Sequence, residues 1–147
     1  MSQPKITADI MATEVLHCTE KDTLATAHKL MRDHHIRHMP VVDSGSGEFL
    51  GLVTQKEVLR QAFTIAGTKG IAALESAETE ISIIDVMSRD AETVQPQLSL
   101  LDAGRFFLES KHGCLPVVVE GKLVGIITSA DFVKLSVTLL EQNSNHD

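Results

Sequence analysis

Residues 115–131 read LPVVVEGKLVGIITSAD, and this stretch decides the fold. Two apolar runs rich in β-branched residues flank Glu120 and Gly121, which is the pattern of two strands joined by a tight turn. Thr128 and Asp131 end the stretch with the spacing of a helix start. The stretch therefore predicts a buried β-hairpin that runs directly into a helix.

A second copy of this pattern occurs earlier in the chain. Residues 39–57 read MPVVDSGSGEFLGLVTQKE and end in Thr-x-x-Glu instead of Thr-x-x-Asp. Pro40 precedes Pro116 by 76 residues, whereas Thr54 precedes Thr128 by 74, because the first turn is two residues longer. Insertions fall in surface loops, so the change of offset supports an internal repeat.

Both repeats predict the same order of elements. These are a helical entry ending at Met11 or Met87, a strand near 15–18 or 91–94, a helix over 22–34 or 99–111, the hairpin, and a helix over 55–66 or 129–140. The fold class is α/β, more narrowly α+β, with two pseudo-symmetric β-α-β-β-α repeats. Each repeat is expected to form a small mixed sheet packed by helices, parallel across the strand–helix–strand part and antiparallel in the hairpin.

The repeats set the predicted domain boundaries. Residues 6–66 form the first repeat, residues 67–80 a linker with a short helix, and residues 81–141 the second repeat, followed by a frayed tail over 141–147. One repeat is marginal as an independent core, so the two are expected to pack together. The helices of both repeats are also expected to supply the interface of a homodimer.

Composition and charge argue against several functions. The 147 residues suit one compact domain or two very small ones. A net charge of −7 and the absence of Trp and Tyr argue against nucleic-acid binding. No apolar run has membrane-spanning length, and the amino terminus lacks the apolar run of a secretory signal. Cys18 and Cys114 lack metal-ligand spacing and are expected to pack as small apolar residues, which favours a reducing cytoplasmic location.

Taken together, the motifs resemble a known family. An Asp-x-Met entry, an apolar-Pro-Val-Val strand and a Gly-x-x-Thr-x-x-acid junction each occur twice and in the same order. They resemble a stand-alone pair of cystathionine-β-synthase-type (CBS) domains, the Bateman module. The resemblance implies a non-catalytic regulatory module that binds AMP, ADP, ATP or S-adenosylmethionine in the cleft between repeats. It also implies a homodimer that signals to a regulated protein in trans, with no cofactor required.

The two Thr-x-x-acid pairs have two readings. As helix capping boxes, each hydroxyl accepts a helix N–H and each acid reaches back to the backbone. As binding residues, which the resemblance implies, Asp131 and Glu57 accept hydrogen bonds from ribose hydroxyls, while Thr128 and Thr54 help to hold the phosphate. The longer Glu57 departs from the commoner aspartate.

Cations and catalytic groups complete the candidate set. Arg37 and His38 precede the first hairpin and are candidates to offset phosphate charge, whereas Gly113 and Cys114 occupy the same places in the second repeat. His34, His35 and His38 have no secured metal-ligand geometry. No nucleophile–base–orienter set is present, so an enzyme is not expected. A ligand-free dimerisation or scaffold module with degenerate pockets remains the alternative function.

Overall fold

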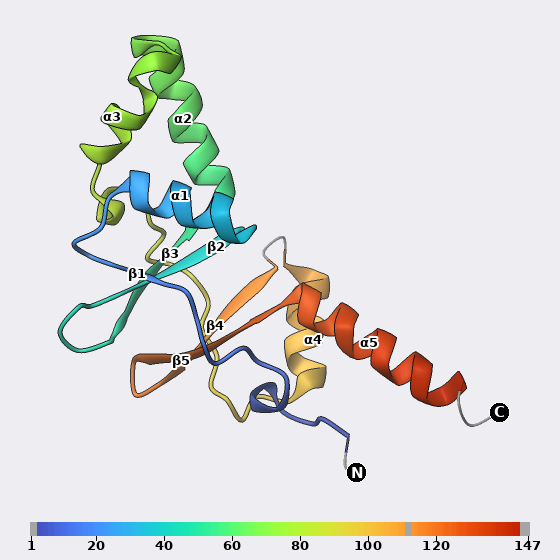
Figure 1. Cartoon of the computed structure of the whole chain (residues 1–147). Coiled ribbons are helices and arrows are strands. Elements are labelled where there is room, and N and C mark those ends of the chain that lie inside the picture. Colours follow the sequence, from blue (N-terminus) through green and yellow to red (C-terminus); the bar gives the residue numbers. More distant parts are fainter. Residues whose placement is uncertain (1–2, 111–112, 145–147) are drawn as a thin grey trace. The chain divides into compact units, whose positions relative to one another are not determined.

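A computed structural model describes residues 3–110 and 113–144 of the chain (Figure 1). The helices are α1 (Leu24–His34), α2 (Gln55–Lys69), α3 (Leu74–Thr79), α4 (Leu100–Glu109) and α5 (Ser129–Ser144), and short 3-10 helices are η1 (Thr7–Asp9), η2 (Ile71–Ala73) and η3 (Ile83–Asp85). The strands are β1 (Cys18–Thr19), β2 (His38–Val42), β3 (Phe49–Thr54), β4 (Cys114–Val119) and β5 (Lys122–Thr128). Contacts group the chain into unit 1, Met1–Val15 with Glu92–Asp147, and unit 2, Leu16–Ala91.

The predicted elements form, with shifted boundaries. The first helix begins at Leu24 instead of residue 22, because the Asp22 carboxylate accepts the Thr19 N–H at 2.8 Å and closes a turn before the helix. The helix expected over 55–66 continues to Lys69, so α2 takes up the first residues of the predicted linker. The short helix expected in the linker is present as η2 and α3.

The tail was expected to be frayed from residue 141, but α5 continues to Ser144. The matching helix of the second repeat was expected over 99–111, but α4 ends at Glu109 because Ser110 is already extended. The expected end at residue 111 itself lies outside the described residues.

Unit 2 is built on a three-stranded mixed sheet in the order β1-β2-β3. Strands β1 and β2 pair in parallel with Cys18 opposite Val41, and β2 and β3 pair antiparallel. Helix α1 buries Leu24, Ala27 and Met31 in the core of this unit. The expected parallel crossover and antiparallel hairpin of the first repeat are therefore confirmed.

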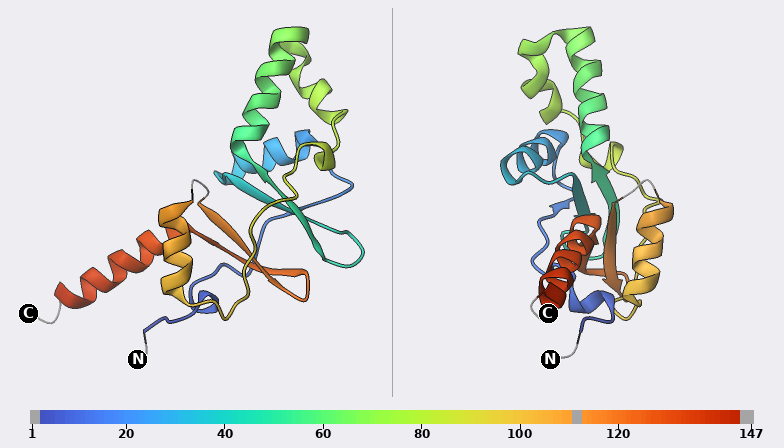
Figure 2. Two further views of the ribbon diagram at one scale, coloured as in Figure 1. Left: turned by 180° about the vertical axis from the view of Figure 1, so that it is seen from behind. Right: turned by 90° about the vertical axis from the view of Figure 1, so that its right-hand side faces the viewer.

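Unit 1 repeats this arrangement with a shorter first strand. Strands β4 and β5 form an antiparallel hairpin, whose turn places Glu120 and Gly121 at positive φ of 51° and 82°, as a type I′ turn requires. Val94 pairs with Val117 as an isolated parallel bridge, in the place that β1 has in unit 2. Figure 2 shows each hairpin with its turn at one end and the following helix at the other. The predicted fold class, β-α-β-β-α in each repeat, is confirmed.

The entry segments, taken as the helical entry of each repeat together with the residue that follows its methionine, explain why the compact units differ from the sequence repeats. Ala12, in the entry of the first repeat, exchanges two 2.9 Å backbone hydrogen bonds with Ile126 on β5. Ser88, in the entry of the second repeat, exchanges the same pair of bonds with Leu52 on β3 at 2.8 and 2.9 Å. Each entry segment thus pairs with the hairpin of the other repeat. The repeat boundaries 6–66 and 81–141 stay a prediction from the sequence pattern.

Strand glycines make these pairings close. A Cβ atom on Gly51 would lie 2.6 Å from the Ser88 carbonyl oxygen and 2.9 Å from Met87 Sδ. A Cβ atom on Gly125 would lie 2.6 Å from Met11 Sδ and 2.9 Å from the Ala12 carbonyl oxygen. The repeated glycine and the repeated methionine therefore belong to the same contact, which is formed once in each unit.

Candidate functional site

The candidate residues lie where each hairpin meets its helix. Antiparallel pairing places the first residue of one strand opposite the last residue of the next, so His38 is opposite Thr54 and Cys114 is opposite Thr128. The residue before each first strand accepts the first N–H of the following helix through its carbonyl oxygen. The Gln55 N–H donates to the Arg37 oxygen at 2.9 Å, and the Ser129 N–H donates to the Gly113 oxygen at 3.0 Å. We call Arg37, His38, Thr54 and Glu57 the first junction. Gly113, Cys114, Thr128 and Asp131 are the second junction.

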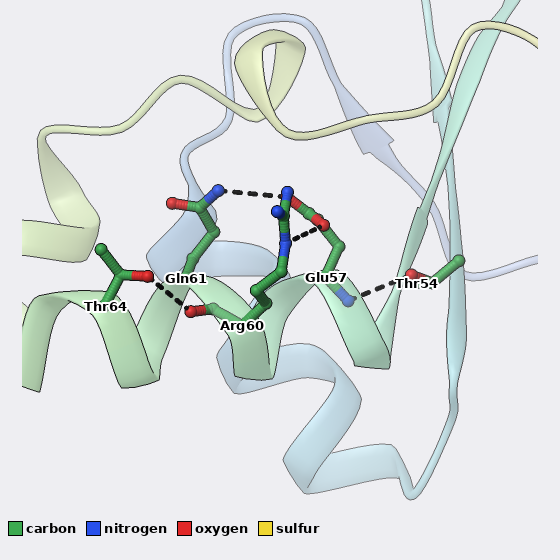
Figure 3. A network of polar contacts seen from close by, with 5 residues as sticks. All are labelled: Thr54, Glu57, Arg60, Gln61 and Thr64. Atoms are coloured by element: carbon green, nitrogen blue, oxygen red, sulfur yellow. Dashed lines mark hydrogen bonds and ion pairs between the residues drawn. The ribbon is translucent and has the colours of Figure 1, made fainter.

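At the first junction, Thr54 caps the helix and Glu57 binds its own helix. Thr54 Oγ1 accepts the Glu57 N–H at 3.2 Å. The Glu57 carboxylate receives two hydrogen bonds from Arg60, Nε to Oε2 at 2.9 Å and Nη2 to Oε1 at 2.7 Å, and a third from Gln61 Nε2 to Oε1 at 3.1 Å (Figure 3). Both carboxylate oxygens are therefore engaged.

The electrostatics follow from this geometry. The hydrogen bonds from Arg60, with a further one from Gln61, hold the pKa of Glu57 below its ordinary value. The same contact raises the pKa of Arg60. The Glu57 side chain is 25% exposed and the Arg60 side chain 71% exposed, so water reaches the pair and screens it. Glu57 is thus a partly covered, fully ionised carboxylate with a cation already bound.

At the second junction, the acid turns back onto its own threonine. Asp131 Oδ2 accepts the Thr128 N–H at 2.8 Å and the Thr128 hydroxyl at 3.2 Å. Asp131 Oδ1 receives no hydrogen bond from the described residues. The half-buried carboxylate therefore keeps one oxygen available in the first turn of α5.

Each junction contains one half of the expected capping box. The hydroxyl half is present at Thr54, whereas the acid half is present at Asp131. At the first junction, the Glu57 carboxylate binds Arg60 instead of the backbone. At the second junction, the Thr128 hydroxyl donates to Asp131 instead of accepting a helix N–H. The repeats therefore share a motif but use it differently, and capping accounts for only part of each pair.

The cysteine of the second junction is buried beside the acid. Burial, and then the nearby Asp131 carboxylate, raise the pKa of the Cys114 thiol to about 12. Burial and Asp22 raise the pKa of Cys18 to the same value. Both thiols are thus protonated at neutral pH and pack as small apolar groups, as expected.

The expected cations are present at the first junction only. Arg37 is exposed and His38 is half-buried next to Thr54. At the second junction, Gly113 occupies the place of Arg37, and a Cβ atom there would lie 2.9 Å from Ser129 Oγ. The second junction therefore combines the available acid oxygen with a backbone position that carries no side chain.

Sequence reasoning missed Arg60 and Gln61. They lie three and four residues after Glu57, the spacing at which helical side chains meet. That spacing was a usable signal, because a helix was already predicted over 55–66, but spacing alone does not say which donor within reach binds the Glu57 carboxylate. Among residues 3–110 and 113–144, no group of His, Cys, Asp and Glu side chains could hold a metal ion.

A separate groove of about 490 Å³ lies between α1 and the linker in unit 2. His28 Nδ1 on α1 is 2.8 Å from Glu78 Oε2 on α3, and both side chains line the groove. Glu78 is buried, so this contact ties the linker to α1. No junction residue lines the groove, so it is distinct from the candidate site.

Comparison with known proteins identifies the family. The model of the CBS domain matches residues 7–63 and again residues 83–138. The chain belongs to the CBS domain family. The two junctions are therefore equivalent positions of two CBS repeats.

Two solved structures resemble most of the chain. The crystal structure of AcuB from Vibrio cholerae is 33% identical, covers 97% of this chain and 98% of its own, and has a TM-score of 0.81. The structure of CBSX2 from Arabidopsis thaliana in complex with AMP is 25% identical, covers 91% and 97%, and has a TM-score of 0.75. The protein MJ1225 of Methanocaldococcus jannaschii is 30% identical over 86% of this chain, which spans 41% of the length of MJ1225.

Proposed function

We propose that this CBS pair is a non-catalytic regulatory module that binds an adenosine-containing ligand of the AMP class and signals to a partner protein. The second junction is the proposed ribose site. Its acid, Asp131, lies at the start of a helix and has one oxygen that receives no hydrogen bond from the described residues. Vicinal ribose hydroxyls donate to a carboxylate, and Thr128 at the N-terminal end of α5 suits a phosphate.

The observation that carries this proposal is the available oxygen of Asp131. The contact that caps α5 uses only Asp131 Oδ2, which accepts the Thr128 N–H. The other oxygen of the carboxylate can therefore accept hydrogen bonds from a ligand without loss of the cap. The bound AMP in CBSX2, a protein of the same fold along 91% of this chain, supports the ligand class. ADP, ATP and S-adenosylmethionine belong to the same proposal, because all carry the ribose that Asp131 would recognise.

Calorimetric titration with AMP tests the proposal. We expect saturable binding to the full chain and a higher melting temperature at saturating AMP. A ligand at a hundred times its dissociation constant adds about 2.7 kcal/mol to the free energy of unfolding, which corresponds to roughly 5–10 °C for a domain of this size. If AMP, ADP, ATP and S-adenosylmethionine all fail to bind or stabilise the protein, the ligand-free scaffold is the better description.

The module is also proposed to be a homodimer. Large apolar side chains are exposed on three helices, at Leu59 and Phe63 on α2, Leu101 and Leu108 on α4, and Val133, Val137 and Leu140 on α5. Helix α1 was expected to contribute, but its apolar stripe is buried inside unit 2. The proposed interface is therefore restricted to α2, α4 and α5, because exposed apolar surface of this kind is typical of protein–protein contacts.

Phe63→Glu should weaken the dimer. The Phe63 side chain is 77% exposed, so a charge there leaves the monomer intact but would be buried in the dimer. We expect the dimer dissociation constant to rise by about tenfold or more, measured by analytical ultracentrifugation. Thr64→Glu adds the same charge one residue further along α2 and serves as the control. A wild-type protein that sediments as a monomer at micromolar concentration would contradict the dimer.

A further inference from the structure

We propose that Arg60 determines affinity at the first junction by holding the Glu57 carboxylate away from ribose. The inference rests on the proposed function, because it concerns the same type of ribose contact in the first repeat. It makes the two junctions unequal, with the second open and the first partly closed by its own helix. Arg60 acts through Glu57, so it is a positioning residue.

The hydrogen bonds at the two acids support this inequality. A carboxylate offers about four acceptor positions. Arg60 and Gln61 occupy three at Glu57, spread over both oxygens. Thr128 occupies two at Asp131, both on Oδ2. A vicinal diol donates two hydrogen bonds, so Asp131 can accept both on Oδ1, whereas Glu57 must first release a donor.

The charge of the donor makes release costly. The guanidinium of Arg60 binds both oxygens of Glu57 side by side, and such two-point charged contacts are stronger than hydrogen bonds from neutral hydroxyls. A ribose hydroxyl would replace the charged Arg60 donor with a neutral one. The new hydrogen bond to the Glu57 carboxylate would therefore be weaker than the one that is lost. Because the pair is exposed to water, the penalty is modest rather than prohibitive.

The second repeat shows what happens without this contact. The positions that match Arg60 and Gln61, 74 residues further on, are Lys134 and Leu135. Leu135 packs on the core of unit 1, and no hydrogen bond or ion pair joins Lys134 to Asp131. The shorter Asp131 instead reaches its own threonine. The difference between the junctions therefore comes from a few side chains at equivalent helical positions of the two repeats.

Removal of Arg60 tests the inference in a protein whose second junction is disabled. AMP is titrated into Asp131→Ala and into the double variant Asp131→Ala/Arg60→Ala. We expect the double variant to bind AMP about two- to fivefold more tightly, the range spanned by exposed ion pairs. Carboxyl NMR titration should show the pKa of Glu57 rising when Arg60 is absent, because the Arg60 hydrogen bonds are the largest cause that lowers it.

Lys134→Ala is the matched control, because it removes the equivalent cation of the second repeat. It should leave AMP binding by the wild-type background unchanged. If the double variant binds no more tightly than Asp131→Ala, the inference is overturned, and weaker binding would mean that Arg60 contacts the ligand itself. Wild-type protein that binds no AMP contradicts the proposed function instead, so the two failures are distinguishable.

Discussion

Asp131→Ala is expected to weaken AMP binding by about ten- to a hundredfold while the protein stays folded. The substitution removes the carboxylate oxygen that receives no hydrogen bond from the described residues and is proposed to accept the ribose hydroxyls. Loss of a charged acceptor costs roughly 1.5–3 kcal/mol of binding free energy. Calorimetric titration of wild type and variant measures it directly.

The same substitution also removes a helix contact, and the two effects separate by measurement. Asp131 Oδ2 accepts the Thr128 N–H, and loss of such a contact at a helix start lowers the free energy of unfolding by about 0.5–1 kcal/mol. If Asp131 only stabilises the start of α5, melting temperature falls and AMP affinity stays the same. That pattern would remove the ribose assignment from this residue.

A matched variant isolates the general effect of a first-turn acid. Asp102 lies in the first turn of α4 in the same unit, is exposed, and its N–H is capped by Ser99 Oγ at 3.1 Å. Asp102→Ala therefore removes a first-turn carboxylate without touching the second junction. It should lower stability slightly and leave AMP affinity unchanged. A loss of affinity equal to that of Asp131→Ala would show that the effect is not local to the junction.

Gly51→Ala is expected to lower the free energy of unfolding by about 2–3 kcal/mol. The added Cβ atom would lie 2.6 Å from the Ser88 carbonyl oxygen, which is backbone and is itself hydrogen-bonded to the Leu52 N–H. The entry segment must move and that hydrogen bond must lengthen. Chemical denaturation measures the loss, which corresponds to roughly 4–12 °C in melting temperature.

The equivalent Gly125→Ala should cost less, because its nearest obstacle at 2.6 Å is the flexible end of Met11, and its backbone obstacle, the Ala12 carbonyl oxygen, is further away at 2.9 Å. Gly67→Ala on α2 is the control, since a Cβ atom there meets nothing within 4 Å. Alanine is the better helix former by about 0.8–1 kcal/mol, so this variant should be neutral or more stable. If Gly51→Ala is as stable as Gly67→Ala, the entry segment does not pack on β3 as described.

Particular residues show how far the sequence alone reached. The Glu120-Gly121 turn predicted the second hairpin, and the spacing of apolar residues predicted the helices, because turn chemistry and periodicity belong to neighbouring residues. The first short strands were less well placed. β1 is Cys18–Thr19 and Val94 forms only a bridge, because strands this short are defined by their partner rather than by their own sequence.

The candidate site divides in the same way. The repeat identified Thr54, Glu57, Thr128 and Asp131 as equivalent positions. The antiparallel register places His38 opposite Thr54, with Arg37 next to it in the sequence. The state of each acid was not predictable from the motif. A carboxylate in a first helical turn has several donors within reach, and their competition depends on side-chain length and on which residues follow on the helix.

The sequence by itself determined the repeat, the order of elements and the positions of the two junctions. Only the tertiary structure decided that each entry segment pairs with the hairpin of the other repeat, Ala12 with Ile126 and Ser88 with Leu52. Both hairpins present the same backbone edge and the same strand glycine, so the local pattern of an entry segment fits either one. Which hairpin an entry segment pairs with depends on backbone hydrogen bonds between residues far apart in the sequence, and local sequence patterns do not predict these bonds.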